Sequence, residues 1–528
     1  MKRELDYYVR QTALGRMGRR SFLGRAAALG VTSATASTLL AQSVLAQGPR
    51  RGGHLPVGLQ GGESTDSLDP ATYANPATVA GARITGETLV NVSPMNKIEA
   101  AAAEEWSVSD DRLTWRFRIR QGMRFHDGSP ITPEDAAQTL RRHSDPDSKS
   151  AVLAIMKGIT EISTDGDWLV LTTQTPNADL PYLLADYHLI LQPNGGFDAP
   201  DAPVFSGPYR WVENEPGVRH TFERFEDYWN DAVGHFETIE IVVINDGTAR
   251  NAALQARQVH LINRVSPRLA DRMQGLSGLT IARTAGKSQT VFAMHCDTAP
   301  FDNNDLRMAL KLAIDREDLL AKLLNGYGTL GNDMPVNAAY PFFDETIPQR
   351  TYDPDQARFH YERSGHSGAI PLRVSDAAFP GAVDAAQLYQ SQAAAAGIEI
   401  ELIREPQDGY WSNVWNKQPF CASSWLGRSV QDQIYTSAYY SVSDWNDTNF
   451  FNDRFDQLLI EARAETDPVL RKEMYGEMGR LVRDQGGLIN PMFADDIDAF
   501  SDEITGWVED PNGALMNMFA PTRMWSTA

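Results

Sequence analysis

The chain has 528 residues, of which 42% are hydrophobic and 22% are charged, and its formal net charge is -21. This composition is typical of a large globular protein and excludes a disordered chain or a bundle of membrane helices. The negative charge disfavours nucleic acid and anionic lipid as partners, and two cysteines are too few for a disulfide scaffold, a cysteine-rich zinc site or an iron–sulfur cluster.

The first 46 residues differ from the rest and predict an export signal. Arg19 and Arg20 stand directly before Ser-Phe-Leu, a weakly apolar run covers 26–40, and Val-Leu-Ala at 44–46 is typical of a cleavage site. The run is too short and polar to span a membrane, which takes roughly 20 apolar residues. We therefore predict a twin-arginine signal peptide over 1–46, cut after Ala46, with an amphipathic helix as the alternative. No cysteine lies near the cut to carry a lipid, so we expect a soluble periplasmic protein.

Helix and strand patterns alternate along the rest of the chain, which predicts an α/β fold. A helix is predicted to begin at Thr132-Pro133, because threonine caps helices and proline fits the first turn. Apolar residues at helical spacing predict a helix over 306–314. The later predicted elements are a helix from Asp315 to Asn325-Gly326, a helix over 383–396, a strand over 398–402 and a helix capped by Asp467-Pro468.

Known catalytic patterns are absent from the sequence. It contains no His-Glu-x-x-His helix, no Gly-x-Ser-x-Gly turn and no Ser-x-x-Lys pair. Gly286-Lys287-Ser288 is similar to the end of a phosphate-binding loop, but residue 281, where that loop needs glycine, is isoleucine. His126-Asp127-Gly128 is predicted to be a turn and not an acid–base pair. We predict no enzyme activity, no cofactor and no metal site, and the competing hypothesis is a periplasmic enzyme on a similar scaffold.

Four blocks of sequence, in a fixed order, carry a resemblance to a known family. They are 103–136, which contains Arg-Phe-His-Asp-Gly-Ser-Pro; 206–229, which contains Ser-Gly-Pro-Tyr and Asp-Tyr-Trp; 300–316, which begins with Pro-Phe-Asp-Asn; and 455–493, which ends in Pro-Met-Phe. Together the blocks resemble the dipeptide/oligopeptide-type solute-binding proteins of ATP-binding cassette (ABC) importers, the large extracellular family 5.

The resemblance implies a two-lobed α/β fold of the periplasmic-binding-protein type II class, with the ligand cleft between the lobes. One lobe would comprise 47–292 and 486–528, and the other 293–485. An extra subdomain over roughly 79–203 would belong to the first lobe.

The resemblance also implies a binding protein and not an enzyme. It would enclose a small, peptide-like ligand and deliver it to a membrane permease that works with a cytoplasmic ATPase. The signal adds the twin-arginine export machinery as a partner. Family members are usually monomers, so we expect a monomer.

At the ligand site the sequence departs from the peptide-binding members of the family. In those members an aspartate three residues after a tryptophan holds the α-ammonium of the ligand. Here Trp425 is followed at that position by Arg428, whose guanidinium suits a carboxylate, phosphate or sulfonate. Asp432 remains able to accept a cation, and a salt bridge of Arg428 within its own loop is the structural alternative. The ligand is thus predicted to be peptide-like or anionic, with an opine, a sugar acid or a metal chelate as non-peptide alternatives.

Other residues are assigned by the same resemblance. Trp425 and Tyr410 are expected in the aromatic wall of the pocket, and Tyr73 at a cleft position of the first lobe. Cys296 and Cys421 are expected on neighbouring strands of the second lobe, where the periplasm would permit a structural disulfide.

Overall fold

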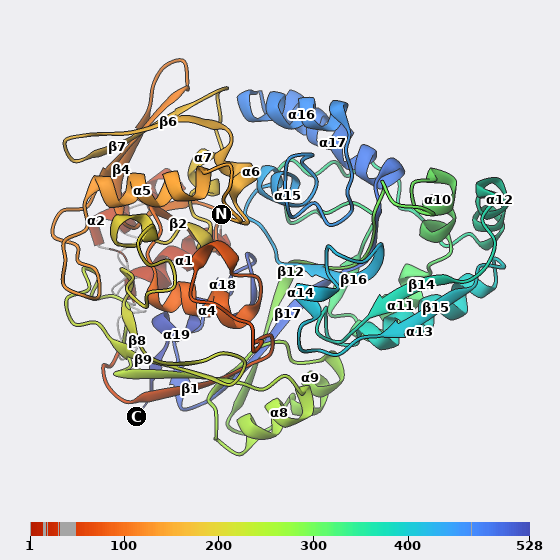
Figure 1. Ribbon diagram of the computed structural model, residues 1–528. Coiled ribbons are helices and arrows are strands. Elements are labelled where there is room, and N and C mark those ends of the chain that lie inside the picture. Colours follow the sequence, from red (N-terminus) through yellow and green to blue (C-terminus); the bar gives the residue numbers. More distant parts are fainter. Residues whose placement is uncertain are drawn as a thin grey trace.

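The computed structural model describes residues 2–13, 17, 19–29, 31, 49–465 and 467–527. The predicted cleavage site at 44–46 lies outside the described residues. Two α/β lobes stand side by side, and long strands run from one into the other (Figure 1). The two-lobed fold predicted from the sequence is therefore confirmed.

One mixed sheet of 11 strands runs through both lobes in the order β15-β14-β16-β12-β17-β11-β1-β10-β9-β8, with β13 paired to β17. Its centre is formed by two long antiparallel strands, β12 (Leu279–Met294) and β17 (Leu488–Ser501). The remaining strands are β1 (His54–Leu59), β8 (Tyr209–Glu215), β9 (Arg219–Arg224), β10 (Thr238–Val243), β11 (Leu261–Ile262), β13 (Gly328–Leu330), β14 (Ile370–Val374), β15 (Ile400–Arg404) and β16 (Phe420–Trp425).

The first lobe contains the N-terminal half of this sheet and the C-terminal tail. Its core joins β1 and β10 to α4 (Pro76–Thr85) through side chains such as Leu55, Ile84 and Ile239. The other elements are η1 (Pro70–Thr72), β2 (Val90–Val92), β3 (Ile98–Ala100), η2 (Tyr187–Leu189), η3 (Pro193–Gly196), α8 (Gly247–Gln255), α9 (Pro267–Met273), β18 (Ile504–Thr505), α18 (Ala514–Asn517), α19 (Ala520–Arg523) and β19 (Trp525–Ser526).

A second, antiparallel sheet of four strands has a core of its own. The order is β4 (Ala103–Val108), β5 (Thr114–Ile119), β7 (Trp168–Thr173) and β6 (Ile159–Asp165). Alternate residues of β5 and β7 are buried, so one face packs under α5 (Pro133–Ser144), whose Leu140 enters the same cluster as Phe117 and Leu171. Two short helices, α6 (Leu153–Met156) and α7 (Leu180–Leu183), complete this layer.

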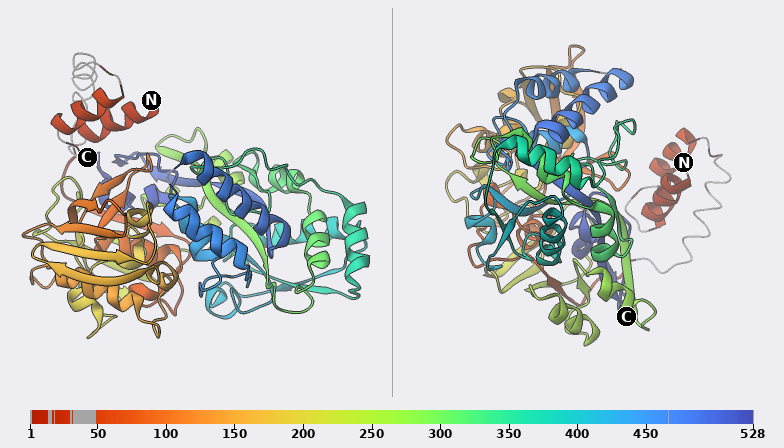
Figure 2. Two further views of the ribbon diagram at one scale, coloured as in Figure 1. Left: turned by 90° about the horizontal axis from the view of Figure 1, so that it is seen from above. Right: turned by 90° about the vertical axis from the view of Figure 1, so that its right-hand side faces the viewer.

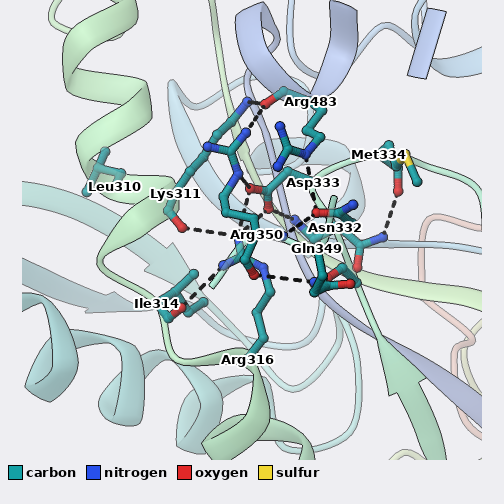
Figure 3. Close-up of polar contacts among 12 residues, drawn as sticks. Leu310, Lys311, Ile314, Arg316, Asn332, Asp333, Met334, Gln349, Arg350 and Arg483 are labelled. Atoms are coloured by element: carbon teal, nitrogen blue, oxygen red, sulfur yellow. Dashed lines mark hydrogen bonds and ion pairs between the residues drawn. The ribbon is translucent and has the colours of Figure 1, made fainter. Parts of the chain in front are cut away.

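The second lobe is built around β14, β15 and β16. The described helices in it are α10 (Asn304–Leu312), α11 (Arg316–Leu324), α12 (Pro354–Ser364), α13 (Ala382–Ala394), α14 (Tyr410–Asn413), α15 (Gln431–Ala438), α16 (Asp453–Ala464) and α17 (Pro468–Gln485). A buried polar network ties α10, α11 and the 331–350 segment together: Asp333 accepts hydrogen bonds from Arg316 at 2.6 and 2.7 Å and pairs with Arg350 at 2.9 Å (Figure 3). Asp333 is fully buried, so this network fixes the packing of the lobe.

Several helix boundaries predicted from the sequence are confirmed. Thr132 caps α5 in a reciprocal capping box with Asp135, and Asp467 caps α17. Asn325 ends α11 in the left-handed conformation with φ 46°. The helix predicted at 383–396 is α13, and the strand predicted at 398–402 is β15, which begins two residues later at Ile400.

Two N-terminal helices, α1 (Lys2–Ala13) and α2 (Arg19–Ala28), lie on the outer side of the first lobe (Figure 2). Tyr7, Phe22 and Ala26 belong to the same apolar cluster as the first-lobe core. Across the described ranges, no helix combines the length and apolarity needed to cross a membrane.

Candidate ligand-binding site

The end of β16 brings the predicted site to the junction of the lobes. β16 pairs with β12, with Trp425 opposite Gln289, and β12 in turn pairs with β17. Leu426 and Arg428 follow directly, so this segment projects between the lobes. Three cavities of about 80, 40 and 40 Å³ surround it, and Leu426 lines all three. Each has room for a few water molecules.

Both lobes line these cavities. The largest contains Arg264 and Val265 of the first lobe together with Phe379 and Trp425 of the second. One of the smaller two has Pro76 and Arg264 against the tryptophans of the second lobe, and the other has Val79 and Arg83 against Arg428. A ligand held here contacts both lobes at once.

Hydrogen bonds join the two lobes directly. Gln433 Nε2 donates to Asp186 Oδ2 at 3.3 Å, and Ser64 Oγ donates to Asp408 Oδ1 at 3.1 Å. Lys287, on β12, donates to the Arg428 carbonyl at 3.2 Å and to Asn512 Oδ1 at 3.3 Å. Burial lowers the pKa of Lys287 to about 8. The Gly-Lys-Ser segment that fails as a phosphate loop thus supports the loop that carries Arg428.

Trp425 belongs to a group of tryptophans that is held by hydrogen bonds to one carboxyl group. Asp447 accepts hydrogen bonds from the indole N–H groups of Trp425 at 3.0 Å and Trp415 at 2.9 Å, and from Ser423 Oγ at 3.3 Å. Trp445 packs on both indoles, with ring centres 6.0 and 5.4 Å away. Burial raises the pKa of Asp447 to about 6, although the three donors act in the opposite direction.

Arg428 is buried, with 7% of its surface exposed. Its backbone N–H donates to Tyr340 Oη at 3.1 Å, and its guanidinium lies 5.9 Å from the Tyr187 ring centre. Its Nε has no hydrogen-bond partner, and no salt bridge of Arg428 is present among the described residues. The alternative of a salt bridge within its loop therefore has no support in the described part of the chain.

The structure places the other three predicted ligand contacts away from the cavities. Asp432 is fully buried in an ion pair with Arg463, at 2.9 and 3.1 Å from Nε. Tyr73 donates to the Leu68 carbonyl and Tyr410 to the Ala422 carbonyl, both at 2.8 Å. None of the three lines the cavities described above. Their polar groups are occupied by partners within the protein.

The disulfide expected between Cys296 and Cys421 is not formed, and both thiols are free. Cys421 pairs in register with Ala293, so the two segments are neighbours as expected. However, Cys421 packs in the cluster of Phe292 and Ile370, whereas Cys296 packs against the separate cluster of Tyr439 and Leu488. The two side chains therefore lie in different parts of the core.

His126 has a structural role, as its turn pattern predicts. Its Nε2 lies 3.1 Å from the Gly207 carbonyl oxygen, and Gly128 takes a φ of 87°. Burial lowers the pKa of His126 to about 4. No group of three or more His, Cys, Asp or Glu side chains is arranged to hold a metal within the described ranges.

A larger cavity, of about 470 Å³, lies outside the cleft between the N-terminal helices and the first lobe. Tyr7, Gln11 and Arg25 form one wall, and Glu87 and Trp229 belong to the other. Because one wall lies within the predicted signal peptide, cleavage after Ala46 would open this cavity to solvent. The smaller cavities between the lobes are therefore the better candidates for a ligand site.

Sequence reasoning missed Arg264 and Tyr187, which line the cavities from the first lobe. Neither stands in a recognisable motif. Arg264 has φ 49°, a left-handed backbone that is uncommon outside glycine, but no local pattern predicts it. Arg264 precedes Arg428 by 164 positions and Tyr187 precedes it by 241, so only the fold brings them together.

Comparison with known proteins places this architecture in a family. Residues 97–447 match the bacterial extracellular solute-binding proteins, family 5 Middle. Heme-binding protein A of Haemophilus influenzae is 23% identical over 457 residues, which cover 79% of this chain and 82% of that protein.

Two solved structures share the fold. The AgaA binding protein of A. tumefaciens R10 in complex with agropinic acid superposes with a TM-score of 0.82 at 22% identity, covering 90% of this chain and 99% of that chain. The DppA binding protein of Helicobacter pylori in complex with the peptide STSA superposes with a TM-score of 0.82 at 18% identity, covering 91% and 99%. Because the family match spans more than half of the sequence, the chain belongs to the bacterial extracellular solute-binding proteins of family 5.

Proposed function

We propose that this protein is the periplasmic solute-binding component of an ABC importer and that it encloses a small ligand between its lobes. The observation that carries the proposal is the set of cavities around Trp425 and Arg428, which both lobes line. A ligand that contacts both lobes stabilises the closed form, and a permease that recognises this form receives the ligand.

Opening would take place about the two strands that cross between the lobes. β12 and β17 are paired along most of their length, and the register shifts between Thr284 and Ser288 and between Thr290 and Phe292. Such irregularities let a strand bend locally. We place the lobe boundaries close to these strands, with 47–292 and 486–528 in one lobe and 293–485 in the other, and 79–203 as the extra subdomain.

The ligand is peptide-like or anionic. Relatives of the fold were solved with a peptide and with agropinic acid, so the scaffold accommodates both classes. At the position where peptide-binding members hold the α-ammonium with an aspartate, this chain has a buried arginine, Arg428. A buried guanidinium repels an ammonium group and attracts an anion, which favours anionic solutes over ordinary peptides.

Export through the twin-arginine route, cleavage after Ala46 and a monomeric state belong to the same proposal. They rest on the Arg19-Arg20 motif and on the resemblance to the family. The permease with its cytoplasmic ATPase is the expected partner.

Thermal unfolding of the protein without residues 1–46 tests the function. Dipeptides, opines, sugar acids, amino acids and nickel are added in separate titrations. A ligand present at 100 times its dissociation constant adds about 2.7 kcal/mol to the free energy of unfolding, which raises the melting temperature by a few degrees. Stabilisation by one class, with the compound recovered unchanged, supports a binding protein, whereas conversion of the compound supports an enzyme.

A further inference from the structure

Two arginines reach the same small cavity from opposite lobes. Arg264 follows β11 in the first lobe, and Arg428 follows β16 in the second, and both line the cavity of about 40 Å³ next to Trp425. No acidic side chain lines this cavity. Five aromatic side chains form much of its lining, namely those of Tyr187, Trp411, Trp415, Trp425 and Trp445.

Arg428 forms no direct salt bridge with a described residue; Asp186 acts on its guanidinium through charge, and the Tyr187 hydroxyl is its side-chain hydrogen-bond partner. Arg428 is 7% exposed, and its Nε makes no hydrogen bond with any of the described residues. The nearby carboxylate of Asp186 is held by His188 Nδ1 at 2.6 Å. Asp186 thus serves His188, Gln433 and Arg428 together, which leaves the Arg428 guanidinium with donors that can bind the anionic group of a ligand.

Arg264 is similarly placed. Its guanidinium makes no salt bridge or hydrogen bond with a described residue, but Asp496 and Asp498 act on it through charge, and its backbone N–H donates to Asp498. The nearby acids also have other partners: Asp495 pairs with Arg283 at 2.5 Å, Asp496 accepts from Ser288 Oγ at 3.4 Å, and Asp498 accepts from the Leu515 N–H at 2.6 Å.

We propose that Arg264 and Arg428 hold one ligand carboxylate between them, with an aromatic or other flat apolar group of the ligand on the tryptophan wall. This inference rests on the proposed function and adds the substrate class: carboxylates whose anionic end carries no ammonium group. The cavity accepts a group of carboxylate size, and the body of the ligand extends past Leu426 into the cavity of about 80 Å³, which includes Phe379 and Met492. Since each lobe supplies one guanidinium, binding of the carboxylate closes the protein.

The carboxylate can come from the C-terminus of a peptide or from an organic acid, and matched probes distinguish the two. The peptide probes are Phe-Phe, its C-terminal amide, its N-acetyl derivative and the N-acetyl amide. The organic-acid probes are indole-3-acetate and indole-3-acetamide. Calorimetric titration of each probe into the protein without residues 1–46 gives the dissociation constants.

We expect each carboxylate to bind about 10- to 100-fold more tightly than its matched amide, because charge-assisted hydrogen bonds are lost in the amide. N-Acetyl-Phe-Phe should also bind more tightly than Phe-Phe. Arg264→Gln and Arg428→Gln should each remove the preference for the carboxylate, and Arg428→Lys should retain part of it. Arg257→Gln is the matched control, because Arg257 has φ 59° like Arg264 but pairs with Asp502 at 3.0 Å outside these cavities.

Far-UV circular dichroism and the melting temperature without ligand establish that each variant is folded. Equal affinity for acids and amides, or a preference that survives in both glutamine variants, would overturn the inference. Tight binding of Phe-Phe and its amide, but not of the acetylated probes, would also overturn it and leave the proposed function in place. If neither these probes nor the wider ligand panel binds, the proposed function fails and the inference fails with it.

Discussion

At the scale of single residues, Asp496 is a cavity-lining carboxyl group whose protonation should change near neutral pH. It lies on β17 and lines the largest cavity between the lobes, beside Arg264 and Asp495. Burial raises its pKa from 3.8 to about 7, while Arg264 and Ser288 act in the opposite direction. Between about pH 4 and pH 7 the folded chain therefore keeps a proton that the unfolded chain has released.

Because the folded state binds more protons in this interval, the free energy of unfolding should fall as the pH rises from 4 to 7. Solvent reaches part of the side chain, so we expect the Asp496 contribution to change by about 1–2 kcal/mol, less than the full shift would give. Asp496→Asn should remove this contribution, which urea unfolding at pH 5, 6, 7 and 8 measures. Parallel pH profiles for the original protein and the variant would contradict the assignment.

The sequence indicated the part of the site that is local. Trp425 ends β16 and Arg428 follows three positions later, so a short pattern places them together, and the structure brings both to the cavities. Asp432 lies only four positions further, but it is in the first turn of α15, and its carboxylate accepts a hydrogen bond from Arg463 of α16 and not from a group in the cavities. Arg264 reaches the cavity because the order of strands in the sheet places the end of β11 beside it, and no local sequence pattern predicts that order.

At the scale of elements, the buried network around Asp333 should dominate the stability of the second lobe (Figure 3). Asp333 bonds Arg316 and Arg350 and also accepts from the Asn490 backbone at 3.0 Å. Asp333→Asn would leave the buried Arg316 guanidinium without its counterion and would leave Arg350 with Asp484 alone, so we expect a loss of about 3–5 kcal/mol. Denaturant unfolding followed by circular dichroism measures the loss.

Glu345→Gln is the matched control for this prediction. Glu345 pairs with Lys472 at 2.6 Å on the surface, where solvent screens the interaction, so its loss should leave the unfolding midpoint almost unchanged. If both variants unfold at the same denaturant concentration as the original protein, the network is not a source of stability.

Helix starts were predictable because a cap is a local device. Thr132 accepts a hydrogen bond from the Asp135 N–H, Asp467 accepts from the N–H groups of Val469 and Leu470, and both helices have proline in the first turn. The disulfide was not predictable in the same way. The sequence indicates that the two cysteines lie near each other on neighbouring segments, but it does not indicate which way each side chain points. In the structure the two thiols enter different apolar clusters.

At the scale of the whole molecule, closure depends on contacts far from the cavities. Arg471 of α17 forms an ion pair with Asp179, which precedes α7 in the first lobe, and both are more than nine-tenths buried. Beside this pair, the Ala178 N–H donates to the Arg463 carbonyl at 3.1 Å. This contact joins the extra layer of the first lobe to the last two long helices of the second (Figure 1).

Arg471→Gln should therefore shift the protein toward an open form, because opening lets water solvate the Asp179 carboxylate that the substitution leaves without its cation. Small-angle scattering of the ligand-free variant should give a larger radius of gyration than that of the original protein. Ligand affinity should fall by about tenfold if closure becomes about 1.4 kcal/mol less favourable. Arg454→Gln removes an arginine that pairs with Glu477 at 2.8 Å within the second lobe, and it should change neither quantity. An unchanged radius of gyration and affinity in Arg471→Gln would mean that the cavities alone hold the lobes together.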